Sequence, residues 1–140
     1  MIEVVNRQRK HKLDLKHWQE FVDAATKLVA APSQSVTVAF VSDRAMRDLN
    51  RIWRQRKGTT DVLSFPAGPP DIPGEEPTLG DVVISVDRAA EQARQNGLTL
   101  ENEIEQLVLH GLLHLWGYDH ETDNGEMNRL ELKLRRKLGI

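Results

Sequence analysis

The stretch that decides the fold is residues 101–120, "ENEIEQLVLHGLLHLWGYDH". Its apolar residues recur at helical spacing, which predicts a helix over residues 101–117 that packs against a sheet. The expected packing residues are Ile104, Val108, Leu109, Leu112, Leu113, Leu115 and Trp116. Thr99 is in position to cap the start of this helix. Gly117 is expected to stop or bend it, because glycine adopts backbone angles that are closed to other residues.

Three of the five histidines of the chain lie in this stretch. His110 and His114 are four residues apart, so they share one helix face and are close enough to bind one metal ion. His120 follows the bend and can approach from the far side. Three histidines that leave one position open are typical of a catalytic zinc site. We therefore predict one zinc ion per chain, bound by His110, His114 and His120. His11 and His17 belong to no such pattern and are expected to be surface residues.

Gly111 occupies the position at which the H-E-x-x-H helix of a zinc peptidase carries its glutamate base. Glycine cannot take a proton from the attacking water, so peptidase chemistry is disfavoured. Asp119, beside the third histidine, can serve as a base or a partner of a metal ligand, or it can simply hold the turn. Glu103 and Glu105 can likewise support a histidine, or form an ordinary acidic first turn of the helix.

The rest of the chain supplies alternating strands and helices. Strands are expected at residues 2–6, 35–42, 61–66 and 81–86, and helices at 14–32, 44–56, 87–97 and 124–138. The expected boundary residues are Pro32, Ser42 or Asp43, Gly58, Gly97 and Gly139. Residues 66–77 hold five of the six prolines and are expected to form a loop, which is either a lid over a site or a plain surface excursion. This order predicts an α+β or α/β layer fold with about four strands.

The bulk composition is that of a soluble globular protein. The 140 residues suit one domain, residues 1–140, and 39% hydrophobic with 29% charged residues is an ordinary balance. The sequence has no apolar run near 18 residues and no signal-peptide pattern, so we expect neither a membrane span nor secretion. The chain has no cysteine, which excludes disulfides and thiolate metal ligands and fits a reducing cytosol.

The net charge of −2 hides two basic clusters. One comprises Arg44, Arg47, Arg51, Arg54, Arg56 and Lys57, and the other Arg129, Lys133, Arg135, Arg136 and Lys137. Either cluster can be a solvated helix face, and either can bind phosphate groups.

Three sequence blocks carry a more specific signal. "HGLLHLWGYDH", residues 110–120, resembles the H-G-x-L-H-L-x-G-Y-D-H signature of the YbeY family of bacterial metal-dependent endoribonucleases. "LNRIWRQRKGTTDVLSFP", residues 49–66, is similar to that family's L-N-x-x-x-R and T-D-V-L-S-F-P motifs. "LGDVVIS", residues 79–85, matches L-G-D-I-x-I-S. The similarity runs over roughly residues 35–138, and Trp53 departs from the tyrosine that the family often has before the arginine.

The resemblance implies an α+β fold in which a small mixed sheet packs with helices and the metal-binding helix is like that of zinc peptidases. It implies zinc on His110, His114 and His120, and a functional role for Arg54, whose guanidinium can make a two-pronged contact with phosphate. Asp61 and Asp81 match the motifs too, and we interpret them as turn or strand-end residues.

The resemblance also implies a function. It is cleavage of single-stranded RNA in the cytoplasm, in 16S ribosomal RNA 3′ end maturation and ribosome quality control. The expected partners are precursor 16S rRNA and the small ribosomal subunit, with no DNA and no membrane. Either water or the ribose 2′-OH can be the nucleophile. The alternatives are a noncatalytic ribosome-assembly factor with a mainly structural metal, and another zinc-dependent hydrolase such as a peptidase or amidase.

Overall fold

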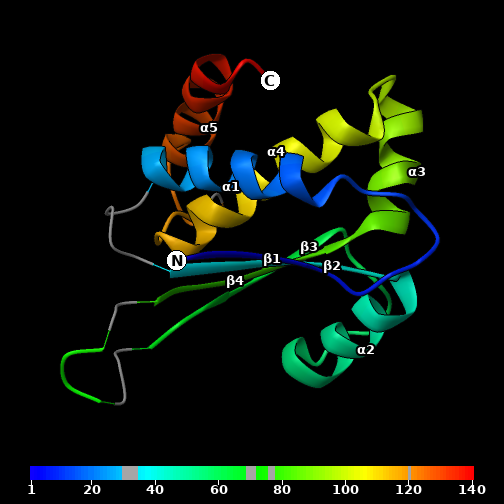
Figure 1. The fold of residues 1–140 in the computed structure, drawn as a ribbon, viewed down its shortest axis with the longest axis horizontal. Helices are drawn as coiled ribbons and strands as arrows, with labels where there is room; N and C mark the ends of the chain where they lie inside the picture. The colour runs from blue at the N-terminus through cyan, green and yellow to red at the C-terminus, as the bar shows by residue number, and fades with distance from the viewer. Residues whose placement is uncertain (30–34, 69–71, 76–77, 120) are drawn as a thin grey trace.

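A four-stranded mixed sheet forms the centre of the computed structural model, which describes residues 1–29, 35–68, 72–75, 78–119 and 121–140 (Figure 1). The strands are β1 (Ile2–Asn6), β2 (Ser35–Val41), β3 (Val62–Pro66) and β4 (Thr78–Ser85), in the order β1-β2-β4-β3. β1, β2 and β4 are parallel, whereas β3 runs antiparallel to β4 and forms one edge. The predicted α+β fold with a small mixed sheet of about four strands is confirmed.

The helices cover the two faces of this sheet unequally. Helices α1 (Leu15–Val29), α3 (Val86–Asn96), α4 (Leu100–Leu115) and α5 (Glu126–Leu138) lie on one side, and α2 (Asp43–Arg54) lies on the other (Figure 1). The main core lies between the first group and the sheet, around Trp18, Phe40 and Leu112. A smaller core, around Met46 and Leu63, lies under α2.

Helix α4 is buried on two sides. Ile104, Val108 and Leu112 face the main core, whereas Leu109 and Leu113 pack against Met127 and Leu134 of α5. This double burial explains why the helix is apolar around much of its circumference. One expected packing residue was wrong: Trp116 follows the last turn of α4 and is 42% exposed, because the helix has already ended at Leu115.

Most of the expected helix ends are confirmed. The Ser42 and Thr99 hydroxyls accept hydrogen bonds from the backbone amides of Ala45 and Asn102, at 3.2 and 3.0 Å. Gly97, Gly117 and Gly139 adopt positive φ angles of 66°, 106° and 73°.

The expected end of α2 at Gly58 was wrong. The helix ends at Arg54, and Gln55 takes the left-handed conformation, with a φ of 53°. The backbone amides of Gln55 and Arg56 both bond to the carbonyl of Asn50, which closes the helix there. Arg54 therefore occupies the last turn of α2, and Arg56 and Lys57 follow in a loop.

Other boundaries shifted slightly. The last helix begins at Glu126 rather than residue 124, after Gly125 at a φ of 92°. Helix α1 is described to Val29, and Pro32, its expected stop, lies outside the described residues. The proline-rich segment joins β3 to β4 as a loop, and residues 69–71 and 76–77 of it are outside the described part, so its role as a lid stays a prediction. No helix within the described ranges is both long and apolar enough to cross a membrane.

Candidate functional site

A cleft of about 680 Å³ opens at the β3 edge of the sheet. Helix α2 and its following loop border it from one face of the sheet, and α4 borders it from the other. Its lining residues are Asn50, Arg54, Arg56, Lys57, 59–64, Pro66, His110, His114, Asp119 and Glu121. The cleft therefore brings the predicted arginine and two of the predicted metal ligands to one place, although they lie more than fifty residues apart in the sequence.

The two histidines of α4 converge on one point. The Nε2 atoms of His110 and His114 are 3.1 Å apart, and their ring centroids are 4.7 Å apart. Two nitrogens on one tetrahedral zinc, with Zn–N bonds of about 2.0–2.1 Å, lie about 3.3 Å apart. This pair is therefore spaced to share one ion. The third predicted ligand, His120, lies outside the described residues.

Glu131 supports the first of these histidines. The Oε1 atom of Glu131 lies 3.1 Å from Nδ1 of His110. Glu131 lies between α4 and α5 and is only 7% exposed. A carboxylate on the second ring nitrogen of a metal-binding histidine fixes the orientation of the ring. Sequence reasoning missed Glu131. The available signal was an acidic residue on the buried stripe of α5, between Met127 and Leu134.

Glu103 and Glu105, the glutamates that the sequence suggested as supports for a histidine, have different surroundings from those of Glu131. Glu103 is buried, and burial together with the nearby Asp61 carboxylate raises its pKa, which Arg135 partly offsets. Glu105 lies near His17 rather than the cleft, and burial and the neighbouring Glu101 raise its pKa.

Gly111 lies where α4 presses closest to the sheet. A Cβ added there would be 2.6 Å from Cγ1 of Val82 and 3.3 Å from Oγ of Ser64. The Ser64 hydroxyl donates a 3.0 Å hydrogen bond to the Gly111 carbonyl, which fastens α4 to β3. A glutamate side chain has no room here. The close packing that holds the histidines over the edge strand therefore also leaves no space for a peptidase base at this position.

The opposite wall of the cleft is cationic. Arg54, Arg56 and Lys57 line it and are exposed, and within the described residues none of the three has a carboxylate at ion-pair distance. Arg51 differs, because it does not line the cleft and lies 3.5 Å from Asp48. Three cations facing a histidine pair form a surface suited to a polyanion.

Comparison with known proteins decides the family. The family model described as Endoribonuclease YbeY matches residues 3–139. This chain belongs to the YbeY family. The resemblance found from the motifs is confirmed, and it extends into the N-terminal third, where no motif had indicated it.

Curated relatives agree with the family match. Endoribonuclease YbeY of Synechococcus sp. (strain CC9605) is 38% identical over 132 residues, which cover 92% of this chain and 80% of that protein. Endoribonuclease YbeY of Myxococcus xanthus is 50% identical over 109 residues, or 75% of this chain. The matches span only 37%, 55% and 62% of the relatives from Myxococcus xanthus, Anaeromyxobacter sp. (strain Fw109-5) and Solibacter usitatus.

A solved structure has the same fold. The solution structure of TM1509 from Thermotoga maritima superposes with a TM-score of 0.68 at 30% sequence identity, covering 99% of this chain and 89% of that one.

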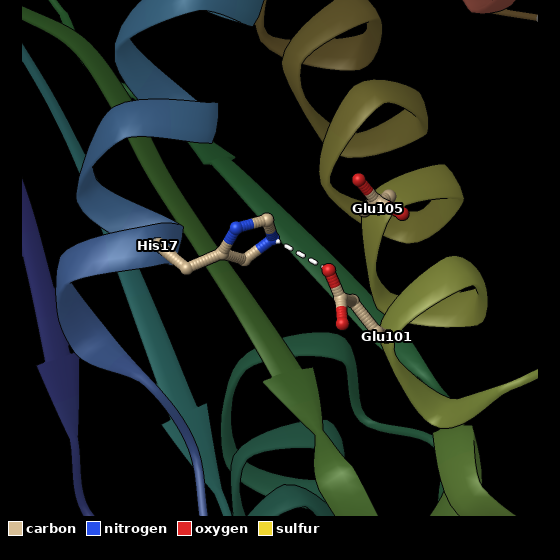
Figure 2. A group of neighbouring side chains, drawn as sticks. All are labelled: His17, Glu101 and Glu105. Atoms are coloured by element: carbon tan, nitrogen blue, oxygen red, sulfur yellow. Dashed lines mark ion pairs between the residues drawn. The ribbon is translucent and has the colours of Figure 1, made fainter. Parts of the chain in front are cut away.

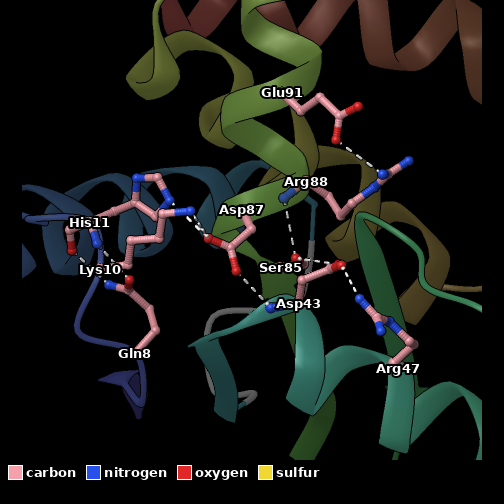
Figure 3. A network of polar contacts seen from close by, with 9 residues as sticks. All are labelled: Gln8, Lys10, His11, Asp43, Arg47, Ser85, Asp87, Arg88 and Glu91. Carbon is pink, nitrogen blue, oxygen red and sulfur yellow. Dashed lines mark hydrogen bonds and ion pairs between the residues drawn. The ribbon is translucent and has the colours of Figure 1, made fainter.

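In this member of the YbeY family, the carboxylates of Asp43 and Asp87 form a network at the starts of α2 and α3 (Figure 3). Asp43 also holds Thr59 of the cleft wall. The Asp43 carboxylate accepts hydrogen bonds from the hydroxyls of Thr59 and Ser85 and from Arg47. Burial alone would raise the pKa of Asp43, but these hydrogen bonds outweigh it and hold the pKa below its usual 3.8.

Asp87 extends the network. Its carboxylate accepts a 2.9 Å bond from the Asp43 amide and lies 3.0 Å from Nε2 of His11 (Figure 3). The Asp43 amide is the main cause that lowers the pKa of Asp87, against the effect of burial. The expectation that His11 is a plain surface residue was wrong, because its ring is partly buried against Asp87 at the start of α3.

A second group could also hold a metal ion. His17 of α1 faces Glu101 of α4 with 3.1 Å between Nε2 and Oε1, and Glu105 lies one turn further along α4 (Figure 2). The ligand atoms of all three lie within 4.8 Å of one another. Sequence reasoning missed this group too, since nothing local connects residue 17 with residues 101 and 105. It is more open than the histidine pair, because the Glu101 side chain is mostly exposed.

Asp119 of the YbeY signature holds the turn after α4. Its carboxylate accepts a 3.0 Å bond from the Glu121 amide, and its carbonyl accepts the amide of Asp123 at 3.1 Å. It also lines the cleft, so a part in proton transfer stays open.

Proposed function

We propose that this protein is a metal-dependent endoribonuclease that cleaves single-stranded RNA in the cleft. The observation that carries the proposal is the meeting of the His110–His114 pair with a wall of three cations. The curated relatives at 33–51% identity are named Endoribonuclease YbeY, which supports this activity class.

The metal would be zinc, held by His110, His114 and His120, with Glu131 orienting the first ligand. The spacing of the two Nε2 atoms and the carboxylate on Nδ1 of His110 both fit such an ion. When bound, zinc supplies positive charge and brings the pKa of its bound water to about 7.

The protein's own groups would position the RNA. The guanidinium of Arg54 can bind two oxygens of the scissile phosphate and offset the negative charge that grows in the transition state. Arg56 and Lys57 can bind neighbouring phosphates. With no side chain at Gly111, a proton leaves the nucleophile by another route, through Asp119 or solvent, and the nucleophile is either water or the ribose 2′-OH.

We extend the proposal to the biological substrate that the family resemblance implies. This substrate is precursor 16S rRNA on or near the small ribosomal subunit in the cytoplasm, where cleavage would serve 3′ end maturation and ribosome quality control.

The crowding at Gly111 disfavours a peptidase. A noncatalytic assembly factor would share the fold and the metal and lack only the cleavage.

The test is cleavage of a defined single-stranded precursor RNA at one salt concentration. Zinc-loaded protein should cut it, and chelator-treated protein should not until zinc is restored. Arg54→Ala should keep its zinc and melting temperature and lose roughly 10²–10³-fold in rate, as for removal of one transition-state donor. Arg54→Lys should recover part of the rate, because an ammonium cannot reproduce the planar fork.

Arg51→Ala is the matched control, one helix turn away and outside the cleft. It should change the rate little. Equal rates for the two alanine variants would refute the role of Arg54, and zinc-loaded protein that leaves the RNA intact would refute the endoribonuclease proposal.

A further inference from the structure

Trp53 is an unusually exposed aromatic residue on the last turn of α2. Its side chain is 66% exposed and that of its neighbour Ile52 is 60% exposed. The position is set by the helix period. Trp53 continues the stripe of Met46 and Asn50, which packs towards the sheet. Since β3 is the edge strand, this stripe runs past the end of the sheet at Trp53 and leaves most of the ring in solvent.

The ring is nevertheless held in place. Its centroid lies 6.5 Å from that of Phe65 on β3, with an interplanar angle of 74°, so the two rings meet edge to face. Such a contact holds one side of the indole, and most of the residue stays exposed to solvent.

Trp53 does not itself line the cleft, but the residue next to it in the chain does. The next residue, Arg54, lines the cleft from α2, and Phe65 lies between the lining residues Ser64 and Pro66 of β3. The indole therefore lies next to Arg54 of the cationic wall and against Phe65 of the edge strand, outside the lining of the cleft itself. A flat aromatic face beside cations is the arrangement by which proteins bind unpaired nucleotides, with the ring stacking on a base and the cations holding phosphates.

We propose that Trp53 is the stacking platform for an unpaired RNA base flanking the phosphate that Arg54 binds. This inference rests on the proposed endoribonuclease function and gives a physical reason why the enzyme would prefer single-stranded RNA to duplex RNA. A base in a duplex is already stacked on both faces, so only an unpaired base can cover the indole.

The experiment measures binding of zinc-loaded full-length protein to two decamers of equal charge, at one salt concentration. Both carry 2′-O-methyl groups, which remove the 2′-OH as a possible nucleophile; one has uridine at every position, and the other is abasic at every position. Trp53→Ala should weaken uridine-decamer binding roughly 5- to 150-fold, the range for loss of one stacked base. It should barely change abasic-decamer binding, zinc content or melting temperature. Trp53→Phe should keep much of the affinity, and the KM for RNA cleavage should follow the binding.

Ile52→Ala is the matched control, because it removes an equally exposed apolar side chain from the adjacent position and should leave both affinities unchanged. Equal uridine-decamer affinity for Trp53→Ala and wild type, with normal cleavage by both, would overturn the stacking role alone. It would point to a protein partner for this aromatic residue. Wild-type protein that binds neither decamer and cuts no RNA would overturn the endoribonuclease function as well.

Discussion

The imidazole of His110 shows how much a single residue of this site depends on its neighbours. Its Nε2 faces His114 within α4, and its Nδ1 faces a buried carboxylate of α5. In the proposed metal site, the second contact would direct Nε2 to the ion, because a ring whose Nδ1 donates to a carboxylate presents Nε2 as a ligand.

Glu131→Gln should therefore weaken zinc binding about 10- to 100-fold, as loss of such supporting carboxylates does. An amide of the same shape keeps the packing but not the charge. Zinc competition against a chromophoric chelator measures the change. Glu126→Gln, the other acid of α5, is the control and should bind zinc like the wild type. If both variants hold zinc equally, Glu131 has only a packing role.

Gly111 makes a different residue-level prediction. In an exposed helix, replacing glycine with alanine stabilises by about 1 kcal/mol, but overpacking a core costs about 1–3 kcal/mol. Val82 is fully buried and branched at Cβ, so it can move little when the added methyl group arrives at 2.6 Å. We expect Gly111→Ala to lower the free energy of unfolding by about 1–2 kcal/mol in urea titrations. Gly68→Ala, at a position with open space, should be neutral, and a stabilised Gly111→Ala would contradict the close packing of α4.

At the scale of elements, the main polar junction lies where β2 and β4 end and α2 and α3 begin. Ser42 and Ser85 cap the two helices, and Asp43 accepts a hydrogen bond from Thr59. The Asp87 carboxylate accepts the Asp43 amide, which ties the two helix starts together (Figure 3). One side of the cleft therefore depends on hydrogen bonds at the starts of two helices as well as on the small apolar core under α2.

The lowered pKa of Asp43 gives a pH dependence with a definite sign. The folded state favours the carboxylate, so this stabilisation is fully present above the unfolded pKa of about 4 and is lost as the pH falls through the lower folded pKa. Asp43→Asn should reduce the free energy of unfolding at pH 7 by about 1–3 kcal/mol, as for disruption of a charged hydrogen-bond acceptor. Its stability should also fall less than that of the wild type between about pH 5 and pH 2. Asp48→Asn, exposed on the same helix, is the control. Parallel pH curves for wild type and Asp43→Asn would disprove the assignment.

At the scale of the whole molecule, the cleft exists because helices on both faces of the sheet reach the same edge strand. Helix α2 brings the cations from one face, and α4 brings the histidines from the other, with β3 between them. Helix α5 then fastens α4 from behind through Glu131 and a small apolar cluster.

Zinc should therefore stabilise the whole fold. At a free zinc concentration 100-fold above its dissociation constant, binding adds about 2.7 kcal/mol, which raises the melting temperature by roughly 5–10 °C. Calorimetry of chelator-treated protein with and without added zinc measures this shift. His114→Ala should abolish it and His17→Ala should not. The reverse result would move the zinc site to the His17, Glu101 and Glu105 group.

The sequence by itself determined the local structure and the family. Helical spacing, β-branched runs and capping residues act over a few residues, so the nine helices and strands of the described residues and the Ser42, Thr99 and Gly97 boundaries could be predicted. The H-x3-H spacing likewise fixed the histidine pair, because one turn of helix determines where both rings lie.

Only the tertiary structure decided which distant residues meet. The strand order, the contact of Glu131 with His110, the pairing of His17 with Glu101 and the crowding at Gly111 all join segments that no local period connects. The exposure of Trp53 and Trp116 was also decided by the tertiary structure. A helical pattern shows which face of a helix is apolar, but it does not show where the helix ends or where the sheet that it packs against ends. Such partners are chosen by the packing of whole elements, and that packing is a property of the assembled fold.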